Sequence, residues 1–231
     1  MPAPPQVNVL YQFSPPTDSW TGQEIYFDTW SQTYKGTITD TYDFYQTADY
    51  GATTTYCYLY KEGVTNLGLI HRIKCKFSVS RLPNDADGRA GIISLGTNTF
   101  GSYYFTEPEL MVRVDGRLEL LYEGVASTQA ISAGTLYDAE IYIDVRDVAN
   151  SVANFYLYIN GELWVTEQDA GWWDDWLTMA SYLSAGPDYW DNAYNNWPDG
   201  SIDVTTHVQD IVWTMEDSAI ALGRWTMLAL L

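Results

Sequence analysis

The stretch Ala139-Glu140-Ile141-Tyr142-Ile143-Asp144-Val145 decides the fold class of this chain. Apolar and polar side chains alternate strictly along it, with the two isoleucines and Val145 on one side. Successive side chains of a β-strand point to opposite faces of a sheet, so a period of two indicates a strand with one buried face. We therefore predict a strand here that faces a hydrophobic core.

Other segments repeat this pattern. Ile73 to Val79 alternates with Cys75 on the apolar side, and a last strand is predicted across Ile202 to Met215. Asp115-Gly116 and Asn160-Gly161 each separate two alternating segments, and such dipeptides are typical of two-residue type I′ hairpins. Many short strands with no helical crossovers predict an all-β sandwich of antiparallel sheets.

The chain divides into three parts on composition. Five of the nine prolines precede residue 17, so residues 1–19 are predicted to form an extended Pro-rich arm and not a packed element. Residues 20–216 form the predicted sandwich, with a long aromatic-rich loop insertion at about 166–200. The apolar segment 217–231 is expected either to close the sandwich as a strand or to dock on a partner.

The order of these motifs from about Leu69 to Thr214 resembles the concanavalin A-like, or laminin-G-like, jelly-roll family. The resemblance rests on the segments KCKFSV at 74–79, AGIISLG at 90–96, the Asp115-Gly116 turn, SAGTLYDAEIYID at 132–144 and FYLYINGEL at 155–163. It implies a jelly-roll sandwich. The family includes carbohydrate-binding modules, glycoside hydrolases, cell-adhesion modules and parts of viral particles, so it leaves the function open.

Tryptophans concentrate between residues 164 and 199, which hold six of the ten in the chain, interleaved with acids and amides. Indole faces can stack on sugar rings while carboxylates and amides bind hydroxyls, so this composition is typical of a glycan site. The candidate ligand-binding residues are Trp172, Trp173, Asp174, Asp175, Trp176, Tyr189, Trp190, Asp191, Asn195 and Trp197. Core filling or a subunit contact explains the same enrichment equally well.

Charge is distributed unevenly along the chain. No Lys or Arg occurs between Arg146 and Arg224, whereas thirteen acids do. Calcium is a possible counterion because it takes several oxygen ligands, although no EF-hand spacing is present. Arg72, Lys74 and Lys76 form a basic stripe on one strand, and with Trp225 and Leu228 they are the candidate partner contacts.

Catalytic motifs are sparse. Glu140 and Asp144 share a strand face, but their Cα atoms would lie about 13 Å apart, too far for the carboxylate pair of a glycoside hydrolase. Family glucanases have a third acid between such a pair, where this chain has Tyr142. The two histidines, His71 and His207, suggest neither a metal cluster nor a nucleophile triad. No catalytic residue is therefore assigned.

Composition limits the partners. With 30 acidic and 11 basic residues the formal charge is −19, which disfavours nucleic acid and anionic membrane surfaces, and no apolar run is long enough to span a bilayer. The first residues lack a secretory signal pattern. Cys57 and Cys75 are interpreted as half-buried thiols, with a bridge between neighbouring strands as the alternative.

The combined expectation is a non-enzymatic structural or adhesion subunit of a bacteriophage particle, such as a decoration or tail-associated protein, assembled in the host cytoplasm. Its expected partners are other virion proteins or a second copy of itself, with a host-surface polysaccharide as a further possibility. The alternative function is a lectin-like carbohydrate-binding module, and a glycoside hydrolase is the third option.

Overall fold

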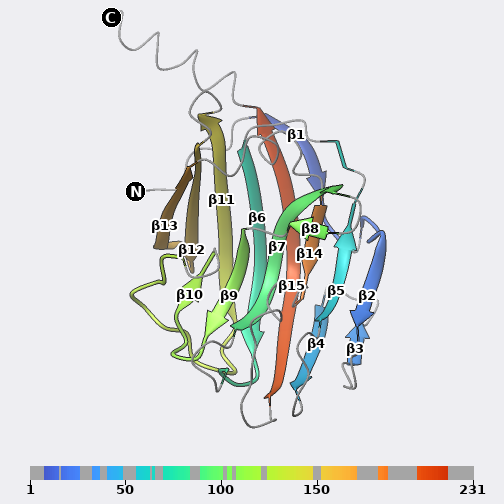
Figure 1. The fold of residues 1–231 in the computed structure, drawn as a ribbon, viewed down its shortest axis with the longest axis vertical. Helices are drawn as coiled ribbons and strands as arrows, with labels where there is room; N and C mark the ends of the chain where they lie inside the picture. Colours follow the sequence, from blue (N-terminus) through green and yellow to red (C-terminus); the bar gives the residue numbers. More distant parts are fainter. Residues whose placement is uncertain are drawn as a thin grey trace, which may run out of the picture.

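The computed structural model describes residues 8–15, 17–26, 33–36, 41–48, 56–62, 64–65, 70–83, 89–100, 103–105, 108–120, 124–147, 152–170, 182–186 and 202–217. These ranges contain β-strands and no helix. The strands form two antiparallel sheets that lie face to face, as Figure 1 shows. The predicted all-β jelly-roll sandwich is confirmed.

The first sheet has eight strands, and it is called the eight-stranded sheet below. Along it the order is β13 (Glu162–Ala170), β12 (Val152–Ile159), β11 (Tyr137–Asp147), β6 (Ile70–Val79), β15 (Ile202–Asp217), β4 (Thr41–Ala48) and β3 (Thr33–Gly36), and β1 (Asn8–Phe13) also pairs with β15. The long strand β15 pairs with β6 on one side and with both β4 and β1 on the other.

The second sheet has seven strands, and it is called the seven-stranded sheet. Its order is β10 (Leu118–Glu119), β9 (Glu109–Arg113), β7 (Arg89–Phe100), β14 (Tyr182–Ala185), β5 (Tyr56–Lys61) and β2 (Gly22–Tyr26), and β8 (Tyr103–Phe105) pairs with β7. In this order β14 lies between β7 and β5, although more than 80 residues separate it from either along the chain.

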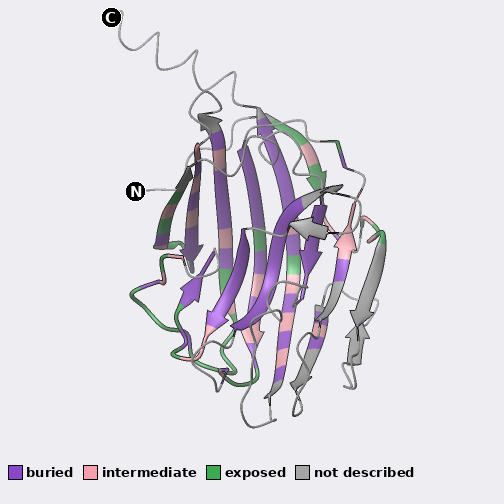
Figure 2. Cartoon of the chain, in the orientation of Figure 1, coloured by how far each residue is buried: buried purple, intermediate pink, exposed green. Residues whose placement is uncertain are grey.

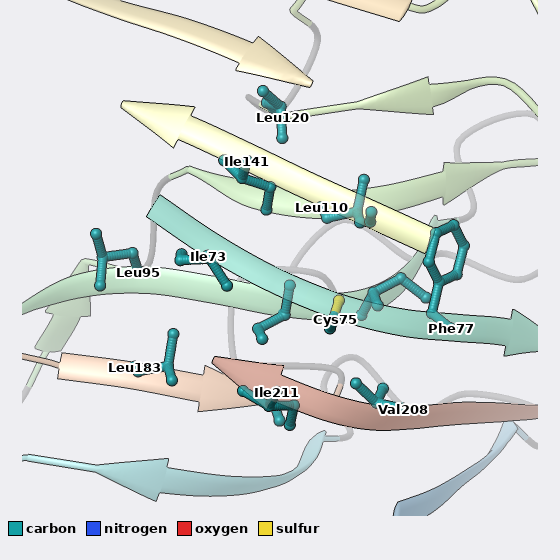
Figure 3. Close-up of a cluster of buried hydrophobic side chains, with 14 of the residues drawn as sticks. Ile73, Cys75, Phe77, Leu95, Leu110, Leu120, Ile141, Leu183, Val208 and Ile211 are labelled. Atoms are coloured by element: carbon teal, nitrogen blue, oxygen red, sulfur yellow. The ribbon is translucent and has the colours of Figure 1, made fainter. Parts of the chain in front are cut away.

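The core fills the space between the two sheets. Figure 3 shows Ile73, Phe77 and Ile141 of the eight-stranded sheet meeting Leu95, Leu110 and Leu183 of the seven-stranded sheet. All six are at most 1% exposed, and burying each such side chain contributes about 1.5–3 kcal/mol. The alternating pattern at 73–79 and 139–145 therefore predicted both the strands and the buried faces correctly.

The two hairpins differ from each other. Asn160 and Gly161 both have positive φ, 50° and 80°, as a type I′ turn requires. The prediction of the same turn at Asp115-Gly116 is wrong. There Gly116 alone has positive φ, the N–H of Gly116 donates to the carbonyl of Arg113 at 2.9 Å, and the N–H of Arg113 donates to the carbonyl of Arg117 at 2.9 Å. This is a three-residue loop with a left-handed glycine.

Part of the predicted N-terminal arm forms a strand. Within the predicted arm 1–19, β1 pairs with β15 and places Phe13 in the core at 1% exposure, so this part is a packed strand. Within the predicted insertion 166–200, β13 continues to Ala170 and β14 occupies Tyr182–Ala185. The tail after Asp217 lies outside the described residues.

The cysteines lie on strands of different sheets, Cys57 on β5 and Cys75 on β6. Cys75 is a free, buried thiol, and the Cys57 side chain lies outside the described residues. Burial, with a smaller contribution from the charge of Asp138, raises the pKa of the Cys75 thiol to about 12. Cys75 is therefore a protonated core residue.

Across the described ranges, no helix has the length and apolar character needed to cross a lipid bilayer.

Candidate functional site

The outer face of the seven-stranded sheet carries polar and charged side chains that are nevertheless buried. On β9, Leu110 and Val112 point into the core, so Glu109, Met111 and Arg113 point to the outer face. Figure 2 shows β7, β9 and β14 buried along almost all of their described length. Burying ionisable groups is costly, so a polar face of this kind marks a candidate functional site.

One row of residues crosses this face at right angles to the strands. In the register of the sheet, Glu109 on β9 lies opposite Ser94 on β7, Ser94 opposite Ser184 on β14, and Ser184 opposite Tyr60 on β5. Neighbouring strands are about 4.8 Å apart, so the row extends about 14 Å. The hydroxyls of Ser94 and Ser184 share a hydrogen bond of 2.5 Å. We call this set the polar row.

Small residues lie beside several members of the polar row. Gly91 and Gly96 occupy outward positions of β7 on either side of Ser94, and Gly22 lies opposite Tyr60. Gly186 follows β14 with φ of 98° and donates its N–H to the carbonyl of Ile92 at 2.9 Å. Glycines in strand interiors commonly mark places where a ligand or another backbone approaches closely.

An arginine cluster lies at the β9–β10 end of the face. Glu119 on β10 is 0% exposed and accepts hydrogen bonds from Nε of Arg89 and, at 3.1 Å, from Nη1 of Arg113. Asp115 accepts from Arg117 at 2.7 Å and lies 3.8 Å from Nε of Arg113. Three guanidiniums thus share the two carboxylates of Glu119 and Asp115.

A pair of tyrosines lies at the other end of the face. Tyr60 on β5 and Tyr182 on β14 stack with ring centroids 5.8 Å apart and planes inclined by 18°. Tyr182 is 0% exposed, while Tyr60 is half-buried. Phenolic hydroxyls can both donate and accept hydrogen bonds and can transfer protons.

The described structure does not test the sequence-predicted glycan residues. Trp172, Trp173, Asp174, Asp175, Trp176, Tyr189, Trp190, Asp191, Asn195 and Trp197 all lie outside the described residues. Along the chain they precede and follow β14, whose Ser184 belongs to the polar row. Their role as sugar platforms stays a prediction.

The basic stripe lies on the outer face of the eight-stranded sheet, and charges of the same chain partner it. Arg72 is 5% exposed and bonds to Glu140 at 2.7 Å and to Glu216 at 3.1 Å, so it is not available to a partner surface. Lys74 and Lys76 remain accessible beside Glu140 and Asp210. Of the other predicted contacts, Trp225 and Leu228 lie outside the described residues.

Neither histidine belongs to the polar row. His71 is buried among core residues, where its Nδ1 accepts a hydrogen bond from Nε1 of Trp213 at 3.4 Å. His207 lies on the outer face of the eight-stranded sheet, with Nδ1 2.7 Å from Asp43 and Nε2 3.0 Å from Gln209. Among the described residues, no group of three histidine, cysteine or acidic side chains could hold a metal ion, so no calcium ligands are assigned.

The two antiparallel sheets and their order define a jelly-roll sandwich of the concanavalin A-like type. No protein-family model matches the sequence, and no curated protein matches it either. Solved structures do match this fold.

Several of these structures are polysaccharide lyases. An endo-β-1,4-glucuronan lyase from the fungus Trichoderma reesei matches with a TM-score of 0.61 and 11% identity, over 90% of this chain and 96% of that one. An alginate lyase from Pseudomonas aeruginosa matches with a TM-score of 0.54 and 14% identity, over 82% and 88%. Alginate lyase A1-II′, of polysaccharide lyase family 7, matches with a TM-score of 0.53 and 19% identity, over 76% and 80%. At these identities the likeness establishes the fold.

The comparisons correct the functional expectation from the sequence. A non-enzymatic structural subunit of a bacteriophage particle was expected, but these neighbours are enzymes that act on polysaccharides. Nothing in them supports a phage decoration or tail protein, so that expectation is wrong. The resemblance to the jelly-roll family is confirmed at the level of the fold.

Proposed function

We propose that this protein is a polysaccharide-cleaving enzyme of the lyase type, which acts on a uronate-containing glycan at the outer face of the seven-stranded sheet. The observation that carries the proposal is the polar row, with an arginine cluster toward one end and stacked tyrosines toward the other. The fold shared with a glucuronan lyase over most of both chains supports it.

A lyase breaks a uronate polymer by β-elimination. A base removes the proton from C5, the C4–O bond to the next sugar breaks, a C4–C5 double bond forms, and the leaving oxygen receives a proton. Atoms and electrons balance without a redox cofactor. The protein must stabilise the negative charge that develops on the carboxylate and must supply the proton-transfer groups.

Tyrosine is the residue of this face suited to proton transfer. Tyr60 is half-buried and directly opposite Ser184, whereas Tyr182 stacked beside it is fully buried. Tyr60 is therefore assigned the proton transfer at C5 and to the leaving oxygen. The hydroxyls of Ser94 and Ser184 are fully buried and bond to each other, so they are assigned to hold β7 and β14 together beneath the substrate.

The arginine cluster is assigned to a different sugar of the same polysaccharide. Arg113 lies four residues along β9 from the polar row and three strands from Tyr60, so one uronate cannot contact both side chains. Arg113 is the half-buried member of the cluster, with 26% side-chain exposure, and it is assigned the carboxylate of a sugar farther along the polymer. The site therefore takes an oligosaccharide and not a monosaccharide.

The test is the ultraviolet absorbance of the unsaturated uronate product. Glucuronan, alginate and polygalacturonate are the acidic substrates, and cellulose oligomers are the neutral control. Tyr60→Phe is expected to lower kcat by at least 100-fold with little change in KM, while Arg113→Ala raises KM. Tyr156→Phe, a half-buried tyrosine on the outer face of the opposite sheet, is the matched control and leaves both constants unchanged.

Two results would overturn the proposal. One is glycan binding without any unsaturated product, which would favour the lectin-like alternative. The other is cleavage that survives Tyr60→Phe and Arg113→Ala together, because the reaction would then take place elsewhere on the molecule.

A further inference from the structure

A pocket of about 310 Å³ opens on the outer face of the eight-stranded sheet, so the two sheets separate it from the polar row. The side chains that line it are those of Lys74, Lys76, Asp138, Glu140, Tyr158 and Asp210. They come from β6, β11, β12 and β15, which are strands in the interior of this sheet.

A β-bulge in β15 forms one wall of the pocket. Gln209 pairs with Lys76 and Val212 with Lys74, so Asp210 and Ile211 together lie opposite a single residue of β6. Asp210 adopts a left-handed φ of 53° and is exposed, while Ile211 is 1% exposed in the core. The bulge thereby directs the Asp210 carboxylate outward, where it pairs with Lys76 at 2.7 Å.

The β12–β13 turn forms the opposite wall. The side-chain oxygen of Asn160 accepts a hydrogen bond from the N–H of Asp138 at 3.0 Å, which fixes the turn to the start of β11. Gly161 also lines the pocket, and a Cβ added there would meet nothing within 4 Å. The wall therefore leaves open space.

Two charged groups of the pocket are available to a ligand. Lys76 is held by Asp210, and Glu140 is held at 2.7 Å by Arg72. The ammonium of Lys74, by contrast, lies 3.6 Å from Glu140 and is 48% exposed. The Asp138 side chain is exposed, and its charge acts on Lys76, the residue directly opposite it on β6. The pocket thus presents one donor group, Lys74, and one acceptor group, Asp138, in a diagonal arrangement across β6 and β11.

We propose that this pocket binds one neutral sugar residue of a glycan chain, as a second glycan site beyond the proposed catalytic face. Two cations against three carboxylates leave a slight negative charge, which disfavours an anionic ligand. A sugar hydroxyl both donates and accepts, so adjacent hydroxyls match Asp138 and Lys74 together. Tyr158 is the aromatic residue of the lining, and it packs with Ile70 and Tyr142 beneath the pocket.

The test is an NMR titration of the full chain that follows the amide signals of Lys74 and Gly161. Cellohexaose and maltohexaose are the neutral probes, and a glucuronate hexamer is the acidic probe. At least one neutral probe is expected to shift both signals saturably. The double variant Lys74→Ala/Asp138→Ala is expected to weaken that binding at least tenfold. The isosteric single variant Asp138→Asn is expected to weaken it at least threefold.

Matched controls separate this site from the proposed catalytic one. Arg81→Ala removes an exposed cation just beyond β6, and Tyr60→Phe alters the opposite face; neither changes the titration. The proposal is overturned if no neutral probe shifts these amides, if binding survives both Asp138 variants, or if only the acidic probe binds. These outcomes do not depend on whether the protein cleaves a uronate polymer.

Discussion

The hydroxyl oxygens of Ser94 and Ser184 lie 2.5 Å apart on neighbouring strands, at the middle of the polar row. Both residues are 0% exposed. A buried hydroxyl that loses its partner carries a desolvation penalty, whereas replacing both partners removes the need for the bond. This contact therefore links the stability of the sheet to its candidate site.

A double-mutant cycle tests that link. Ser94→Ala and Ser184→Ala are each expected to lower the free energy of unfolding by about 1–3 kcal/mol. The double variant should lose less than the sum of the two single variants, because no unpaired hydroxyl then remains. Urea denaturation measures all three variants, and strictly additive losses would show that the two hydroxyls are not coupled.

Glu119 and Asp115 offer a comparison of buried and exposed ion pairs. Glu119→Gln leaves Arg89, at 5% exposure, without its full counter-charge and should cost about 3–5 kcal/mol. Asp115→Asn weakens the exposed pair with Arg117 and should cost less than about 1 kcal/mol. Chemical denaturation measures both losses. Equal losses in the two variants would show that water reaches the Glu119–Arg89 pair as freely as it reaches the Asp115–Arg117 pair.

The ion pair of Asp115 with Arg117 should also make the stability of the protein depend on pH in the acid range. Burial raises the pKa of Asp115, but hydrogen bonds and charge from Arg117 outweigh this and lower it below the usual value. A lowered folded-state pKa contributes stability that is present above the unfolded pKa and is lost as pH falls through the folded one. Asp115→Asn should remove only that small acid dependence.

Three glycines with positive φ differ in what surrounds them. A Cβ on Gly116 would lie 2.8 Å from the carbonyl oxygen of Ile131, whereas at Gly134 and Gly161 it would meet nothing within 4 Å. Alanine at the latter two positions adds only backbone strain, on the order of 1 kcal/mol. Gly116→Ala should lower the melting temperature clearly more than Gly161→Ala. Equal changes in melting temperature would show that a side chain at position 116 does not clash with the carbonyl oxygen of Ile131.

The fold was more predictable than the site because strand faces depend on local pattern. Alternation alone located the buried faces of 73–79 and 139–145. The packed strand β1 was missed because neighbouring prolines dominated the composition, and its pairing with β15 is a contact between the two ends of the chain.

The polar row could not be predicted from sequence because its members come from four strands distant in the chain. Ser184 lies on a four-residue strand inside the tryptophan-rich segment. Nothing in the sequence of that segment indicates that β14 pairs with β5 and β7. Arg72 was likewise interpreted as a surface cation, since its partners Glu140 and Glu216 are supplied by β11 and β15. Only tertiary pairing reveals such charge compensation.

His207 should give the eight-stranded sheet a measurable pH dependence. Burial lowers the pKa of this imidazole, but hydrogen bonds to Gln209 and Asp43 and the charge of Asp43 outweigh it, so the pKa is raised above its usual value. A raised folded-state pKa contributes stability that is fully present below the unfolded pKa and is lost as pH rises through the folded one.

Asp43→Asn is expected to lower the pKa of His207 and to flatten the pH dependence of unfolding on the alkaline side of that titration. NMR titration of the imidazole and urea melts across neutral pH measure the two effects. His207→Gln is the matched control and should abolish the dependence in both backgrounds. An unchanged pKa in Asp43→Asn would show that the 2.7 Å contact carries no charge interaction in solution.

Net charge should govern how the proposed enzyme meets its substrate. The chain carries a formal charge of −19, which repels a polyuronate at long range, while the arginine cluster attracts its carboxylates only at contact. Raising ionic strength from about 0.01 M to about 0.15 M shortens the screening length from about 30 Å to about 8 Å. The long-range repulsion is then lost first, so KM for glucuronan should fall over this range.

Initial rates at several salt concentrations measure this change in KM. The variant Arg113→Ala should start from a higher KM and show the same fall. A KM that rises steadily with salt would mean that local attraction outweighs the net charge.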